Sequence, residues 1–147
     1  MREIKFRGKR KDNNQMIYGE LCIYDDIIFF IGVAKTIFQI RNGVFIPNIV
    51  WYEVLPESVG QFTGSLDKNK NEIYEGDRCE VENGDEFYMG VVIFDNGCFS
   101  LKIDDRTKKS KFTKTYFEYD IGQTPELYNF KNISIVGNIY ENVDLLK

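Results

Sequence analysis

The chain has 147 residues, a formal net charge of −4, 43% hydrophobic and 15% aromatic residues, and no histidine. This apolar content excludes an intrinsically disordered chain and suffices for a packed core in one domain or two very small ones. The missing histidine excludes Ser-His-Asp and Cys-His catalysis, histidine general acid–base chemistry and most catalytic zinc sites.

Short strands and turns are predicted from the start of the chain. Residues 3–8 alternate apolar and charged side chains, which indicates a strand with one wet, basic face, and residues 16–24 return as its partner. Residues 27–33 are continuously apolar, as is typical of a strand buried on both faces. Asn42-Gly43 predicts a tight hairpin, because both central residues need positive φ, and Pro47 is expected to end it.

A polar, turn-rich stretch at residues 59–81, which we call the joint, follows a strand predicted at 49–55 and stopped by Pro56. Two turns are expected inside it, at Asn69-Lys70-Asn71 and at Gly76-Asp77. The joint predicts a division of the chain into an N-terminal β unit, residues 1–58, and a second unit, residues 59–147, that contains the joint.

The second unit shows a regular order of turns and strands. Strands are predicted at 78–82, 88–94, 98–103 and 133–139, and Asp95-Asn96-Gly97 is a tight turn. The connection before the last strand holds a basic run, expected as a loop or ragged strand start, and a short helix at 124–130; a last helical turn is expected at 143–146. This order predicts a small SH3-like barrel, with a plain meander as the alternative. The predicted fold class is all-β: short antiparallel strands in two small β units, with one or two short helices.

No metal or cofactor site is expected. Cys22, Cys79 and Cys98 form no C-x-x-C pair, which predicts free thiols in a reducing cytosol, each in an apolar strand pattern. Residues 67–71 begin like a calcium loop, but Glu72 replaces the glycine and Arg78 the bidentate glutamate that such a loop needs.

Nor does the chain carry a recognisable catalytic centre. Its carboxylate pairs, such as Asp25-Asp26 and Glu75 with Asp77, are expected to form turns; Asp77 can bond its own backbone two residues on. No phosphate-binding loop occurs, and no apolar run reaches the roughly 18 residues of a membrane span. The chain is therefore expected to be a non-enzymatic cytoplasmic protein without a membrane segment.

Basic residues gather in segments 2–11 and 106–114, which hold six and five of the nineteen lysines and arginines. Aromatic residues accompany the second segment, and cations beside stacking rings are typical of single-stranded nucleic-acid sites. The alternative is a solvated strand face and loop. Any binding surface is predicted on these segments and not on the acidic joint. The candidate residues are Lys5, Arg7, Lys9, Lys108, Lys109, Lys111 and Tyr116.

Three blocks of the sequence resemble the YopX-like phage protein family. The joint carries VGQFTG, LDKN and EIYEGD, the chain opens with REIKFR, and it closes with IVGNIYEN. The sequence departs from the family's usual pattern at Gly8-Lys9, at Lys70 where a turn glycine is usual, and at Arg78-Cys79. The resemblance implies a phage or prophage product in a bacterial cytosol, β-rich and without an assigned role.

The favoured interpretation is a phage accessory protein that binds a host or phage protein. A nucleic-acid-binding module using segments 2–11 and 106–114 is the alternative, and an enzyme working with carboxylates alone is a third. Exposed aromatic residues would equally suit a homo-oligomer interface.

Overall fold

The computed structural model describes residues 3–41, 44–83, 86–108 and 132–141. The chain divides into two compact units, Met1–Phe62 and Thr63–Lys147, whereas the sequence placed the division after residue 58. Within the described residues there are ten strands, one 3₁₀ turn and no α-helix, so the predicted all-β fold is confirmed. The helices expected at 124–130 and 143–146 lie outside the described residues.

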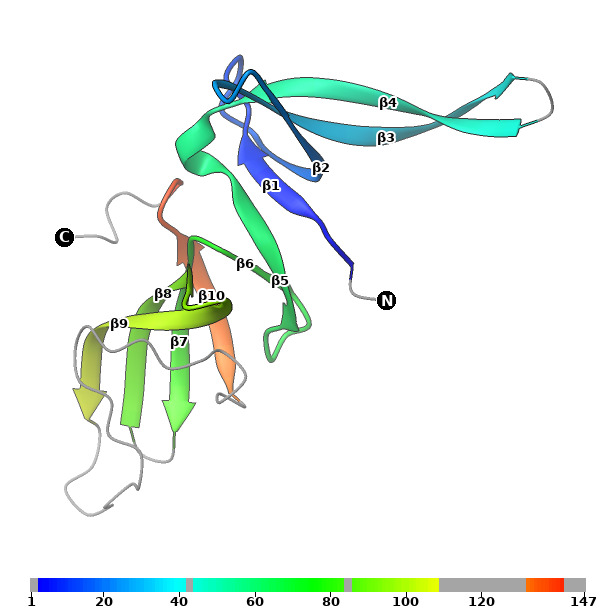
Figure 1. Ribbon diagram of the computed structural model, residues 1–147. Helices are drawn as coiled ribbons and strands as arrows, with labels where there is room; N and C mark the ends of the chain where they lie inside the picture. Colours follow the sequence, from blue (N-terminus) through cyan, green and yellow to red (C-terminus); the bar gives the residue numbers. More distant parts are fainter. Residues whose placement is uncertain (1–2, 42–43, 84–85, 109–131, 142–147) are drawn as a thin grey trace. The chain divides into compact units, whose positions relative to one another are not determined.

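The N-terminal unit contains β1 (Phe6–Lys9), β2 (Met16–Tyr24), β3 (Ile28–Arg41), β4 (Val44–Val54), the 3₁₀ turn η1 (Pro56–Ser58) and the start of β5 (Gly60–Leu66) (Figure 1). Its strands are antiparallel and follow the order β4-β3-β2-β1-β5.

The sheet of the N-terminal unit curls until the end of β4 meets the end of β1. The Leu55 N–H donates to the Lys9 carbonyl at 2.9 Å, and the Lys11 N–H donates to the Glu53 carbonyl at 3.0 Å. Val54 is 1% exposed on the inner side of this curl. Burial of such apolar side chains is the main stabilising term for the unit.

The strands on either side of Asn42-Gly43 pair as expected for the predicted hairpin, with Arg41 opposite Val44, while residues 42–43 themselves lie outside the described residues. The expectation that Pro47 ends the hairpin is wrong, because β4 continues through it to Val54. A register shift in β3 between Lys35 and Phe38 accompanies the proline. Among the described strands, β4 is an edge strand of its sheet. A proline whose nitrogen faces the open edge therefore removes no hydrogen bond between strands.

Two further expectations for this unit are corrected. The strand predicted at 3–8 occupies Phe6–Lys9. Residues 27–33 are not buried on both faces: Ile27 is 72% exposed, while Ile31 is fully buried. Ile27 belongs to the turn before β3, and within β3 the residues from 28 to 33 are half-buried except for Ile31 and Gly32, which are buried.

The C-terminal unit contains the rest of β5, β6 (Glu72–Tyr74), β7 (Asp77–Asn83), β8 (Glu86–Asp95), β9 (Cys98–Lys108) and β10 (Ile133–Asn138). Its four-stranded antiparallel sheet has the order β10-β7-β8-β9. The consecutive strands β7, β8 and β9 form a meander, and β10 pairs with β7. Among the described residues the ladder ends at β9 and β10, and its closure into an SH3-like barrel stays a prediction.

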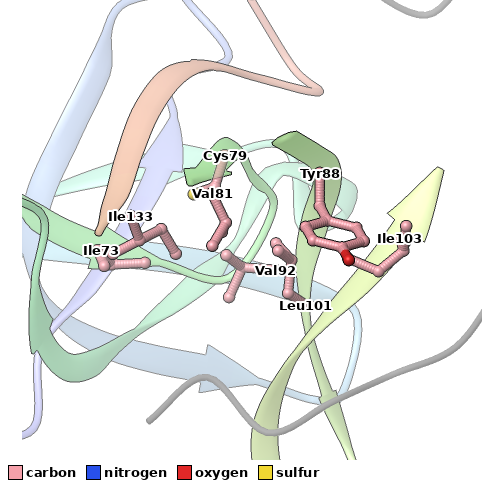
Figure 2. Close-up of a cluster of buried hydrophobic side chains, with 8 residues drawn as sticks. All are labelled: Ile73, Cys79, Val81, Tyr88, Val92, Leu101, Ile103 and Ile133. Carbon is pink, nitrogen blue, oxygen red and sulfur yellow. The ribbon is translucent and has the colours of Figure 1, made fainter. Parts of the chain in front are cut away.

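One buried cluster forms the core of this unit (Figure 2). It brings together aliphatic side chains from β6 to β10, a fully buried tyrosine and a buried cysteine. Its members are Ile73, Cys79, Val81, Tyr88, Val92, Leu101, Ile103 and Ile133.

The tight turns of this unit follow the sequence. Asn96 and Gly97 both have positive φ, 48° and 83°, as a two-residue hairpin turn requires. Gly76 has a φ of 84° before β7. The Asp77 carboxylate accepts a hydrogen bond from an earlier residue, the Tyr74 N–H at 2.8 Å, and not from the backbone two residues further on as expected.

The joint is held by a buried carboxylate. Asp67 is 5% exposed, and its Oδ1 accepts the backbone N–H groups of Asn69 and Asn71, both at 2.8 Å. Its Oδ2 accepts the Asn71 side-chain amide at 3.2 Å and the Ile135 N–H of β10 at 3.3 Å. Asp67 therefore stabilises its own turn and connects this turn to β10.

Candidate functional site

The predicted wet, basic face of the first strand is wrong for Arg7, which is only 3% exposed. The Lys5 ammonium lies 3.6 Å from the Glu3 carboxylate and 5.5 Å from the centre of the Phe62 ring. Lys9 is half-buried. The structure thus leaves little exposed cationic surface along β1.

The cations after β1 are matched by acids. The Arg10 guanidinium donates to the Asp12 carboxylate, with Nε to Oδ1 at 2.8 Å, and lies 4.0 Å from the centre of the Tyr52 ring. The hydrogen bond from Arg10 holds the pKa of Asp12 below its ordinary value. The Lys11 ammonium lies 2.6 Å from the Glu53 carboxylate.

The second basic segment lies in the other unit, and its first residues extend β9 instead of starting a loop. Lys108 is the last residue of β9 and pairs in register with Glu86. Lys109, Lys111 and Tyr116 lie outside the described residues. Whether the seven candidate residues bind anything stays a prediction.

An exposed apolar surface occurs instead on the outer side of the curled sheet in the N-terminal unit. Gly32 of β3 pairs with Glu20 of β2 on one side and with Trp51 of β4 on the other, so these positions share one face. By alternation the same face holds four large apolar side chains that are 37–66% exposed. We call these four the outer face: Tyr18, Tyr24, Ile49 and Trp51.

Gly32 leaves the space that two side chains of the outer face occupy. A Cβ added to Gly32 would lie 2.7 Å from Cζ3 of Trp51 and 2.8 Å from Cγ2 of Ile49. The indole and the isoleucine side chain therefore lie directly over the glycine. Trp51 remains 45% exposed in this position, which leaves a broad part of the ring open to solvent.

A pocket of about 350 Å³ borders this surface at the outer edge of β4. Two aromatic and three charged side chains line it: Lys11, Asp12, Trp51, Tyr52 and Glu53. The arrangement combines ring surface with salt-bridged polar groups, as interfaces with peptides and proteins do.

No metal centre is evident in the part of the chain that the structure describes, since no three His, Cys, Asp or Glu side chains converge there. The described residues also contain no helix long and apolar enough to cross a membrane. None of the three cysteines, all of them among the described residues, forms a disulfide, as predicted. Cys79 is buried like a small hydrophobe, but Cys22 is exposed, contrary to its apolar strand pattern.

Sequence reasoning missed Trp51 and Ile49, which it placed in a strand without assigning them a surface. A usable signal was present: Ile49, Trp51 and Glu53 alternate with Val50, Tyr52 and Val54. The charged Glu53 marks its own set as the outer one.

Two comparisons relate this chain to known proteins. The family model described as YopX protein matches residues 5–147. The crystal structure of protein EF1440 from Enterococcus faecalis superimposes with a TM-score of 0.57 at 22% sequence identity, over 100% of both chains, and supports the fold. None of the curated proteins matches this chain.

Proposed function

The chain belongs to the YopX protein family, and we propose that it is a non-enzymatic phage or prophage accessory protein that binds a host or phage protein in the bacterial cytosol. The observation that carries the proposal is the outer face, where Trp51 lies half-exposed over Gly32 with Ile49 beside it. Tryptophan and tyrosine concentrate binding energy at protein interfaces.

The energy available at Trp51 is large for one residue. A tryptophan buries up to about 250 Å², so covering the exposed 45% of Trp51 would remove roughly 100 Å² from water. At about 25 cal/mol per Å² this is about 2.5 kcal/mol, close to a hundredfold in affinity. Tyr18, 49% exposed on the same face, adds to this surface.

The charges of the described residues favour a protein over a nucleic acid. Phosphate binding needs cations that neutralise the backbone. Among the described residues of segment 2–11, Arg7 is buried, and the cations of Lys5, Arg10 and Lys11 lie beside carboxylates. The net charge of −4 points the same way.

The test is affinity capture from a lysate of the host bacterium, with and without nuclease. The baits are the full chain, its Trp51→Ala variant and, as a matched control, Phe94→Ala, which removes another exposed aromatic from the other unit. We expect the full chain and Phe94→Ala to retain the same proteins after nuclease, and Trp51→Ala to lose them.

Two results would overturn the proposal. Loss of the captured proteins after nuclease would indicate a nucleic-acid bridge, in favour of the basic segments. Equal capture by Trp51→Ala and the full chain would show that the outer face takes no part.

A further inference from the structure

We propose that the outer edge of β4 at Ile49 and Trp51 receives an extended segment of the partner protein as an added β-strand. The inference rests on the proposed protein-binding function and names the form in which the partner binds. Addition of a strand to an open sheet edge provides affinity through main-chain hydrogen bonds and specificity through alternate side chains.

The direction of the backbone groups on β4 follows from two hydrogen bonds. The Glu53 carbonyl accepts the Lys11 N–H and the Leu55 N–H donates to the Lys9 carbonyl, so residues 53 and 55 turn their backbone groups to the outer edge. Along an antiparallel strand, successive residues direct their backbone N–H and C=O groups alternately to the strand on one side and to the other side. Ile49 and Trp51 therefore also direct their N–H and C=O groups outward, where β4 ends the sheet order and no described strand pairs with it.

The open part of this edge is short and bounded at both ends. At one end the ladder to Lys11 begins at Glu53. At the other end Pro47, by the same alternation, turns its nitrogen outward and offers no donor there. Between them lie two N–H donors and two C=O acceptors, enough for roughly three to five residues of an added strand.

The surroundings indicate what such a segment carries. Its side chains on one side would lie beside Trp51 and Ile49, which favours apolar residues at alternate positions. At the Glu53 end the added strand would reach the pocket lined by Lys11 and Asp12. A polar side chain there would lie near the ammonium of Lys11 and the carboxylate of Asp12. The occupant is thus an extended, alternately apolar peptide segment.

A second copy of this chain fits the edge poorly. If two β4 edges paired antiparallel with Ile49 of one copy opposite Trp51 of the other, Pro47 would fall opposite Glu53. That position is already taken by Lys11. The missing N–H of Pro47 and the occupied carbonyl of Glu53 therefore disfavour pairing between two copies. Natural edge strands use such features to avoid aggregation.

The experiment uses a displayed library of tryptophan-free octapeptides selected on the full chain. Trp51 is the only tryptophan, so its emission reports binding of each synthesised peptide. Two variants at one position separate backbone from side chain: Ile49→Pro removes an outward N–H that the β3 ladder does not use, and Ile49→Val keeps it. We expect selected peptides with alternate apolar residues, bound at least tenfold more weakly by Ile49→Pro and within about threefold by Ile49→Val.

Amide hydrogen exchange keeps the test decisive if Ile49→Pro does not fold. In the full chain the Ile49 and Trp51 amides should exchange quickly alone and at least tenfold more slowly with a selected peptide. Peptides that quench Trp51 but protect neither amide, or that bind Ile49→Pro as well as Ile49→Val, would overturn strand addition and leave the proposed function standing. A library that yields no binder also overturns strand addition, while the lysate capture decides the function separately.

Discussion

Replacing Asp67 with asparagine should remove one of the strongest polar anchors in the C-terminal unit. The carboxylate accepts four hydrogen bonds while almost fully buried. An asparagine oxygen can still accept the two 2.8 Å bonds from Asn69 and Asn71. Its NH₂ group, however, would face two donors, the Asn71 side-chain amide and the Ile135 N–H, and both of these bonds would be lost.

The size of the effect follows from those two bonds. A hydrogen bond to a charged group contributes about 1.5–3 kcal/mol, and the lost bonds are the longer ones, at 3.2 and 3.3 Å. Taking the lower value for each gives about 3 kcal/mol. For a unit of this size the melting temperature should fall by roughly 12–24 °C.

The pH dependence has a definite sign. Burial alone would raise the pKa of Asp67, but the hydrogen bonds from Asn71, Ile135 and Asn69 outweigh it and hold the pKa below its ordinary value. A carboxyl whose folded pKa is lowered stabilises the fold above its unfolded pKa of about 3.9, and this stabilisation is lost as the pH falls through the folded value. The difference in stability between the full chain and Asp67→Asn should therefore be constant above about pH 5 and shrink below pH 4.

Calorimetric melting curves from pH 3 to pH 7, with amide exchange at Ile135, measure both effects. Asp95→Asn is the matched control, because that carboxylate is only half-buried and bonds the neighbouring Asn96 side chain. It should change stability by less than about 0.5 kcal/mol. An Asp67→Asn variant no less stable than Asp95→Asn, or a difference that grows towards low pH, would contradict the stabilising role of the Asp67 carboxylate.

Three further substitutions test glycine and turn positions. Lys70→Gly should raise the melting temperature by a few degrees, because Lys70 has a φ of 67° that glycine adopts without strain, and an unchanged or lower melting temperature would contradict this. Gly32→Ala should displace the indole of Trp51 from the sheet, seen as a red-shifted emission, and an unaltered spectrum would argue against the close contact. Gly76→Ala should destabilise by about 2 kcal/mol or more in denaturant unfolding, because φ is 84° and the new Cβ would lie 2.6 Å from the Tyr140 ring; a loss below 0.5 kcal/mol would show that the ring yields freely.

Local chemistry made part of the fold predictable. The Asn42-Gly43 hairpin and the turn at Asn96 and Gly97 follow from residues that accept positive φ, and their strands are confirmed. Pro47 misled the prediction because its effect depends on whether the strand is at an edge, which only the sheet order shows.

Residues whose role depends on distant partners were not predictable. The sequence after Asp67 begins like a calcium loop but lacks two of its required residues, and this pattern gave no other role for Asp67. The hydrogen bond that connects Asp67 to β10 comes from Ile135, which is far along the chain. Arg7 was expected in solvent because alternation gives the face of a strand and not what covers that face. Trp51 was missed although Glu53, two residues further along the strand, shares its face and marks that face as the outer one.

Binding of a protein partner to the outer face through Trp51 can be observed at that residue itself by ¹⁹F NMR. Because the chain has one tryptophan, incorporation of 5-fluorotryptophan gives a single resonance from position 51, and an unlabelled partner contributes none. If the outer face binds the captured partner, that partner shifts this resonance and abolishes most of its H₂O/D₂O isotope shift. A resonance that keeps its position and its full isotope shift at saturating partner would show that Trp51 takes no part in binding.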